Sequence, residues 1–384
     1  MKYYLAEAFM IQKSVKVFHM ADVHLDSPFS IGSPSESEQR RIQLRGAFSS
    51  AVFFAKCEKI DIFLISGDLF DARFVTKDTV EAVMRDFASL PTCKFFISPG
   101  NHDPYNETSV YKNYTFPDNV HVFSGSRECV RLEELGVCVY GVGFTANEYI
   151  SSPVAGYGKL DRDMINILVC HGDMTPSSKY GPVTVNDIAS SSFDYVALGH
   201  IHQKTELLKA GDTYYAYPGC LQGRGFDETG HKGAYYGIVS KEKTEMYWKQ
   251  FSIKRYEWIE CDVSGVSNKA EAIDLIRPRL SEFSADTALR ITLTGTVKGA
   301  FILSASDFGE SNALPYRIEI IDKTVPEPDV SALEKENTLK GLFYRIASER
   351  LANASEEEKK TINSAIKYGL AALEGRDIPM DTNS

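Results

Sequence analysis

The sequence has no long apolar run. No stretch approaches the ~18 consecutive apolar residues that a membrane-spanning helix needs. The apolar segment at residues 5–11 is short, contains Glu7 and lacks a small-residue cleavage site. We therefore expect no membrane span and no signal peptide, and we expect the protein in the cytoplasm.

Cysteine motifs and basic runs are also missing. The 7 cysteines form no CxxC pair and no dense framework, which is typical of reduced thiols in a cytosolic protein. Lys and Arg number 42 against 52 Asp and Glu, so the formal charge is −10. Nucleic-acid binding relies on cations that neutralise phosphates, so this charge argues against strong DNA binding by the chain alone.

The hydrophobic periodicity predicts an α/β protein. With 384 residues, 43% of them hydrophobic, the chain favours one large globular domain with an appendage. Strands alternate with helices at first, and residues 27–38 are expected to form a loop. The expected strands are 15–20, 62–65 and 94–98, and the expected helices are 38–59 and 78–90. From residue 120 onwards, short strands such as 165–170, 193–198 and 203–208 predict a two-layer β core flanked by helices.

Near residue 255 the pattern restarts as a small α+β module. Its expected elements are strand 256–263, helix 269–283, and strands 288–296 and 315–321. A Pro-containing linker at 325–328 precedes two helices, 332–352 and 356–373, the first with an apolar stripe. We expect four segments: an N-terminal extension 1–14, a large domain 15–253, the small domain 254–324, and a linker with a helical segment 325–384.

Side chains that can bind metals follow five of the predicted strands. They are Asp22 and His24, Asp68, Asn101 and His102, His171, and His200 and His202. Ligands gather at the carboxyl edge of open α/β sheets, so the five strand ends can converge there. One strand-end Asp is usually a turn residue, and one buried His is usually a packed core residue. Together the set favours a site for a divalent metal such as manganese, iron or zinc.

The same residues resemble a known family. Asp22-Val23-His24, Gly67-Asp68, Gly100-Asn101-His102-Asp103, His171 and Gly199-His200-Ile201-His202 are similar to the five motifs of the calcineurin-like metallophosphoesterases. The resemblance covers roughly residues 15–250 and implies a four-layer α/β/β/α sandwich with two metals at one end. Residues 15–253 would then be the catalytic domain.

The resemblance also implies the ligand set. Metal one would be held by Asp22, His24, Asp68 and His202, and metal two by Asp68, Asn101, His171 and His200. Asp68 would bridge them, with one carboxylate oxygen on each ion. Two such ions can clamp phosphate oxygens and activate a water for in-line attack. Manganese is the expected ion, and Fe2+, Zn2+ and Mg2+ also suit these ligands.

Three residues are expected to act in catalysis. The family resemblance assigns His102 to the scissile phosphate, where it would stabilise charge or help the leaving oxygen depart; simple packing is the alternative. Asp103 is expected to orient His102 or to cap the next turn. Asp71 stands where archaeal and eukaryotic members usually have His and bacterial members often have Asp, so no second catalytic His is available.

Finer features resemble one branch of the family. Residues 21–29, 67–71 and 217–228 look like the DNA-repair exonuclease branch that includes the bacterial subunit SbcD, and they look closest to its YhaO-like relatives. Cys220 departs from the Ser more often found there. Residues 254–324 stand where this branch has a capping domain, and the helices after residue 332 stand where relatives dock on the coiled coil of an SMC-like ATPase.

The implied function is a two-metal phosphodiesterase that cleaves DNA as the nuclease subunit of an SbcCD-like repair complex. It would act as an exonuclease, with endonuclease activity left open, and its partners would be DNA and an SbcC-like ATPase. A cyclic-nucleotide or small-molecule phosphodiesterase and a non-enzymatic scaffold stay open as alternatives. For the terminal helices, self-packing and homodimerisation stay open.

Overall fold

The computed structural model describes residues 14–29, 33–175, 177–298, 301–309, 314–327, 333, 335–373 and 375. The predicted N-terminal extension lies outside these residues, except for Ser14, which begins the first strand. The chain divides into two compact units. The first comprises Met1–Ile259, Leu280–Ile291 and Glu310–Glu319, and the second Glu260–Arg279, Thr292–Gly309 and Ile320–Ser384. No helix in the described part of the chain is long and apolar enough to cross a membrane.

The first large sheet has six strands in the order β12-β11-β1-β2-β3-β4. They are β1 (Ser14–Met20), β2 (Ile62–Ile65), β3 (Lys94–Ile97), β4 (Val120–Val122), β11 (Gly233–Ser240) and β12 (Thr244–Gln250). Strands β1 to β4 are parallel, and β11 is antiparallel to β1. Every residue of β2 is buried, as expected for a parallel strand covered on both faces. The carboxyl ends of β1, β2 and β3 therefore lie side by side.

The second large sheet also has six strands, in the order β5-β6-β7-β8-β10-β9. They are β5 (Glu128–Leu132), β6 (Val137–Val142), β7 (Ile165–His171), β8 (Tyr195–Gly199), β9 (Leu208–Ala210) and β10 (Thr213–Ala216). Strands β6, β7, β8 and β10 are parallel. The register pairs His171 with Gly199, so the carboxyl ends of β7 and β8 coincide.

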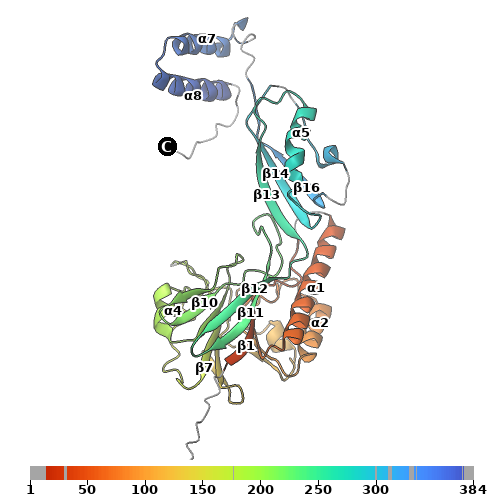
Figure 1. The fold of residues 1–384 in the computed structure, drawn as a ribbon, viewed down its shortest axis with the longest axis vertical. Helices are drawn as coiled ribbons and strands as arrows, with labels where there is room; N and C mark the ends of the chain where they lie inside the picture. The colour runs from red at the N-terminus through yellow and green to blue at the C-terminus, as the bar shows by residue number, and fades with distance from the viewer. Residues whose placement is uncertain are drawn as a thin grey trace, which may run out of the picture. The chain divides into compact units, whose positions relative to one another are not determined.

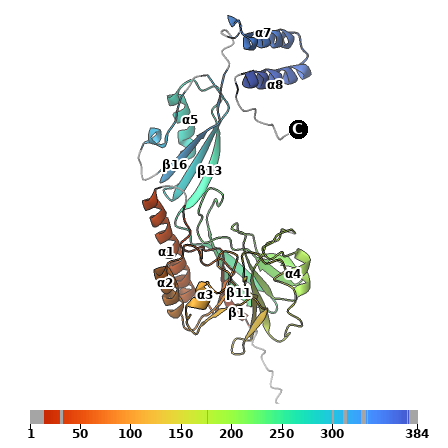
Figure 2. The same ribbon diagram turned by 180° about the vertical axis from the view of Figure 1, so that it is seen from behind.

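The two sheets pack face to face between helices. Val17 and Leu64 of the first sheet share one apolar cluster with Ile167 and Ala197 of the second. Helices α1 (Pro34–Glu58) and α2 (Lys77–Ala88) lie side by side on the outer face of the first sheet (Figures 1 and 2). Helix α4 (Val185–Ser191) covers the second sheet through Ile188, and α3 (Val110–Asn113) is a single turn. The predicted four-layer α/β/β/α sandwich is confirmed.

Some boundaries differ from the sequence prediction. Helix α1 begins at Pro34, inside the segment predicted as a loop, because Ser33 and Glu36 cap each other's backbone N–H groups. Proline suits the first position of a helix, where no backbone N–H is needed. The strand predicted at 203–208 lies later in the chain, as β9.

The small module contains the three-stranded sheet β13-β14-β16, whose residues belong partly to each unit. Its elements are β13 (Arg255–Asp262), α5 (Lys269–Leu280), β14 (Thr287–Thr294) and β16 (Arg317–Asp322), with the strands β15 (Thr296–Val297) and β17 (Val325–Pro326) and the 3-10 helix η1 (Ala305–Phe308). These elements form the predicted α+β module. The domain boundaries at 253 and 324 stay a prediction.

Two helices end the described chain, α7 (Leu339–Ala352) and α8 (Glu356–Leu373). Helix α7 starts later than predicted, because residues 336–338 are not helical and Thr338 caps its first turn. The two helices pack closely: a Cβ atom placed on Gly369 would lie 2.3 Å from the ring of Phe343.

Candidate metal centre

The ligand residues at the ends of β1 and β2 have an unusual backbone. Asp22, His24 and Asp68 each have a φ of 51°, in the left-handed region that residues other than glycine seldom adopt. Hydrogen bonds from Asp22 N to Gly67 O (3.1 Å) and from His24 N to Asp68 O (2.9 Å) join the two strand ends. Such strain costs about 1–3 kcal/mol per residue and clusters at functional sites.

Two glycines allow the ligands to approach one another. A Cβ atom on Gly67 would lie 2.2 Å from Nδ1 of His171, and one on Gly100 would lie 2.3 Å from Oδ1 of Asp68. Both distances are far below van der Waals contact, so a larger residue would push a ligand away. The glycines that precede Asp68 and Asn101 are therefore part of the site's construction.

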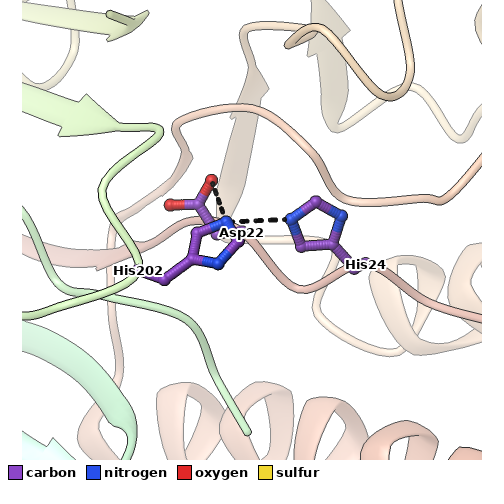
Figure 3. A group of neighbouring side chains, drawn as sticks. All are labelled: Asp22, His24 and His202. Carbon is purple, nitrogen blue, oxygen red and sulfur yellow. Dashed lines mark hydrogen bonds and ion pairs between the residues drawn. The ribbon is translucent and has the colours of Figure 1, made fainter. Parts of the chain in front are cut away.

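The first group of candidate ligands is Asp22, His24 and His202 (Figure 3), whose nitrogen and oxygen atoms lie within 4.8 Å of one another. Nε2 of His24 lies 3.2 Å from Nε2 of His202, and Nε2 of His202 lies 3.8 Å from Oδ1 of Asp22. Asp22 and His24 are buried and His202 is half-buried. The group combines residues from both large sheets.

The second group lies beside the ends of β2, β3, β7 and β8. Nε2 of His171 lies 3.0 Å from Oδ1 of Asn101 and 3.2 Å from Nδ1 of His200. The backbone N–H of His200 donates to the carboxylate of Asp22 at 3.0 Å and so connects the second group to the first.

Asp68 lies between the two groups. Its Oδ2 atom is 3.7 Å from Nε2 of His24 and 3.6 Å from Nε2 of His171. Its Oδ1 atom accepts the backbone N–H of His102 at 2.8 Å. The family resemblance implied one oxygen for each ion, whereas here the single atom Oδ2 faces both groups.

The electrostatics of these residues fit two divalent cations. Burial raises the pKa of Asp22 to about 7 and also raises the pKa of Asp68. Burial lowers the pKa of His171 and of His200 to about 4, and that of His24 well below its usual value, so these imidazoles are neutral at pH 7. Buried carboxylates therefore face neutral nitrogen donors. The set of imidazole nitrogens with carboxylate and amide oxygens suits borderline-to-hard metals.

Residues outside the ligand set contact the second ring nitrogen of three ligand histidines. They are the Ser66 carbonyl for His171 (2.9 Å), Glu228 for His202 (2.7 Å) and Asp173 for His200 (3.8 Å). Burial lowers the pKa of His202, but the hydrogen bond to Glu228 and the charge of Asp22 outweigh this and raise it overall. Nδ1 of His24 has no hydrogen-bond partner in the described chain. Sequence reasoning assigned no role to these contact residues, although Glu228 belongs to the stretch 217–228 that marked the family branch.

The predicted catalytic residues His102 and Asp71 lie beside the first group. Ligand atoms of His24, Asp71 and His102 are within 4.8 Å of one another. The rings of His24 and His102 meet edge to face, with centroids 4.7 Å apart. His102 is exposed, so its side chain can be reached by a substrate at the metal centre, whereas Asp71 is buried.

Asp103 occupies a different place from His102. Its buried carboxylate accepts the backbone N–H groups of Gly100 (2.8 Å), Asp68 (3.2 Å) and Phe70 (3.1 Å) and the hydroxyl of Tyr111 (2.6 Å). Burial and the nearby charge of Asp68 raise its pKa to about 6. Asp103 thus holds the turns that carry the ligands Asp68 and Asn101, rather than the imidazole of His102.

Comparisons with known proteins indicate the family to which residues 15–204 belong. Residues 15–204 match the model of the calcineurin-like phosphoesterase family. The metallophosphoesterase YhaO of Bacillus subtilis is 28% identical over 294 residues, which cover 72% of this chain and 71% of YhaO. The DNA double-strand break repair protein Mre11 of Saccharolobus solfataricus is 27% identical over 247 residues, covering 59% of this chain and 61% of Mre11, less than two thirds of its length. The crystal structure of TT1561 of Thermus thermophilus aligns with a TM-score of 0.38 and 12% identity, over 62% of this chain and 99% of that one.

Proposed function

Residues 15–204 are a calcineurin-like phosphoesterase domain, and from this family membership we propose that the protein hydrolyses phosphodiester bonds of DNA with two divalent metal ions. The observation that carries the proposal is the position of Asp68 Oδ2, which is 3.7 Å from Nε2 of His24 and 3.6 Å from Nε2 of His171. One carboxylate oxygen shared by two ligand groups is suited to a pair of ions. Manganese is the ion we propose.

Different residues of the chain are proposed to bind the ions, to donate a proton and to stabilise charge. Bound divalent ions would polarise the phosphate oxygens and activate the attacking water. His102, exposed beside His24, would contact the phosphate and give a proton to the leaving oxygen as the phosphorus–oxygen bond breaks. Asp71, whose carboxylate lies within 4.8 Å of a ring nitrogen of His102, would stabilise the protonated imidazole.

DNA as the substrate is supported by the similarity to a protein named for the repair of DNA double-strand breaks. The Arg224 guanidinium, 3.2 Å from Nδ1 of His202, supplies positive charge at the centre. The formal charge of −10 is unfavourable for DNA binding by the whole surface. We therefore propose exonuclease and endonuclease activity within an SbcCD-like complex in the cytoplasm, in which an SMC-like ATPase supplies most of the DNA affinity.

Helix α7 is the proposed docking element for that ATPase. Leu339, Leu342 and Ile346 follow helical spacing and are 69%, 47% and 53% exposed. An apolar stripe left in water is suited to a partner helix, and the coiled coil of an SMC-like ATPase offers one. Helix α7 could instead pair with a second copy of the chain, and a binding test must distinguish this pairing from docking on the ATPase.

The deciding experiment incubates the purified full chain with Mn2+ and linear end-labelled duplex DNA, with and without the cognate ATPase. Cleavage that needs Mn2+ and stops with a chelator is expected. Cyclic dinucleotides are tested in parallel. Their hydrolysis without any cleavage of DNA would indicate a small-molecule phosphodiesterase instead of a nuclease. No hydrolysis of either substrate would contradict phosphodiesterase activity.

A further inference from the structure

Glu228 is a buried carboxylate directly behind the metal ligand His202. It is 6% exposed, and its Oε1 atom lies 2.7 Å from Nδ1 of His202. The Arg224 guanidinium donates to Oε1 at 2.8 Å, and the Arg224 backbone N–H donates to Oε2 at 2.8 Å. Cys220 Sγ lies 3.7 Å from Oε2. An ionised carboxylate is costly to bury, and here four N–H donors, including Arg224 Nε at 3.2 Å from Oε1, and a thiol surround it.

The hydrogen bond to Glu228 decides which nitrogen of His202 carries the proton. A carboxylate only accepts, so Nδ1 must carry a hydrogen, and in the neutral imidazole that can bind a metal Nε2 then carries the free lone pair. That Nε2 atom faces the first ligand group, 3.2 Å from His24 Nε2 and 3.8 Å from Asp22 Oδ1. Arg224 also lies 3.2 Å from Nδ1, but a guanidinium has no lone pair to accept a proton there.

The backbone of His202 is held independently of Glu228. Its carbonyl accepts the ammonium of Lys232 at 3.2 Å and the backbone N–H of Cys220 at 3.2 Å. Loss of the Glu228 carboxylate would therefore leave the position of the residue intact. It would release the rotation and the tautomer of the imidazole alone.

We propose that Glu228 is a positioning residue of the metal centre, which fixes the tautomer and the orientation of His202 and thereby sets the affinity of the first ion. Arg224 holds the Glu228 carboxylate in place. Carboxylates that accept a hydrogen bond from a metal-bound histidine typically change metal affinity 10–100-fold. This inference rests on the two-metal part of the proposed function and does not depend on DNA being the substrate.

The test titrates the metal-free full chain with Mn2+ and measures free Mn2+ by electron paramagnetic resonance. The wild type is expected to bind two ions. In Glu228→Ala, one ion should weaken about 10–100-fold and the other should be unchanged, because His202 belongs to the first group alone. Glu228→Gln keeps an oxygen that accepts from Nδ1 but lacks the charge, so it should show a smaller loss at the same ion.

The matched control is Glu128→Ala, which removes a carboxylate 3.2 Å from Nε2 of His121, outside the ligand set. Both Mn2+ affinities should stay at the wild-type values in this control. Unchanged affinities in Glu228→Ala would overturn the proposal. An equal weakening of both ions, together with a lower melting temperature, would show a structural role and would also overturn it. If Glu228→Ala does not fold, wild-type Mn2+ affinity in Glu228→Gln would also overturn the proposal.

A wild type that binds two ions yet cleaves no DNA would contradict the proposed substrate and leave this inference standing.

Discussion

Nε2 of His24 and Nε2 of His202 face each other at 3.2 Å. His202 directs its Nδ1 proton to Glu228, so in the neutral imidazole its Nε2 atom has a lone pair rather than a hydrogen. His24 is fully buried and its pKa is lowered well below the usual value by burial, so it is neutral at pH 7. Neutral nitrogen donors this close together, next to the Asp22 carboxylate, are an arrangement that a divalent cation stabilises.

The first prediction follows from that arrangement: Mn2+ should stabilise the fold. An ion that binds only the native state at 100 times its dissociation constant adds about 2.7 kcal/mol to the free energy of unfolding. Differential scanning fluorimetry of chelator-treated protein should therefore show a melting temperature that rises with Mn2+ concentration. A melting temperature independent of Mn2+ would contradict a preformed metal site.

The second prediction concerns pH. Burial raises the pKa of Asp22 to about 7 in the metal-free protein, so a proton competes with the metal below that pH. Because His171 and His200, with pKa values of about 4, are already neutral there, the groups that must lose protons are Asp22, Asp68 and His202, whose pKa values are all raised. The affinity for the first ion should fall at least about tenfold for each pH unit below 7, because at least one proton must leave the site when the ion binds. Calorimetry in two buffers of different ionisation enthalpy would measure the released proton, and no release at pH 6 would contradict the shifted pKa.

Much of this site could be predicted from the sequence because each ligand closes an apolar strand. Asp68 and His171 follow buried runs, and parallel strands bring such ends to one edge of each sheet. Glu228 could not be assigned a role in this way. It lies in a loop, where the sequence pattern around a carboxylate that contacts a ligand does not differ from that around a carboxylate in water. Its contact with His202 also depends on the path of the chain after β10. The predicted start of α1 at residue 38 was wrong for a similar local reason, because Ser and Pro, as at Ser33 and Pro34, are common both in loops and at helix starts.

The third prediction distinguishes Asp68, which is proposed to bind both ions, from a residue that is proposed to bind only one. Asp68→Asn removes the charge shared by both groups, so the affinities of both Mn2+ ions should fall and hydrolysis should drop at least about 100-fold. Asp22→Asn is the matched variant, because the family resemblance assigns Asp22 to the first ion alone, and the second ion should then bind nearly as in the wild type. Bound manganese counted after gel filtration measures both. Two ions retained by Asp68→Asn would contradict the bridging position.

The fourth prediction distinguishes catalysis from metal binding. His102→Ala should keep both ions, because the exposed imidazole is outside the ligand set, and kcat should fall about 10²–10⁴-fold with little change in KM. His121→Ala, a histidine on β4 away from the centre, should leave kcat unchanged. Loss of one ion in His102→Ala would show that this residue is a ligand instead.

The fifth prediction tests the exposed stripe of α7. Leu342→Asp with Ile346→Asp should lower the free energy of unfolding by no more than about 1 kcal/mol, because both residues are about half exposed in the isolated chain. The same variant should weaken binding to the purified coiled coil of the cognate SMC-like ATPase at least about tenfold, because docking would bury a charge in an apolar interface. Ser348→Asp, on the opposite side of α7, adds a similar charge outside the stripe and should bind like the wild type. Sedimentation of the free chain tests whether a second copy of the chain binds this stripe instead. If the wild type is a dimer, Leu342→Asp with Ile346→Asp is a monomer, and ATPase binding is unchanged, the stripe serves self-association.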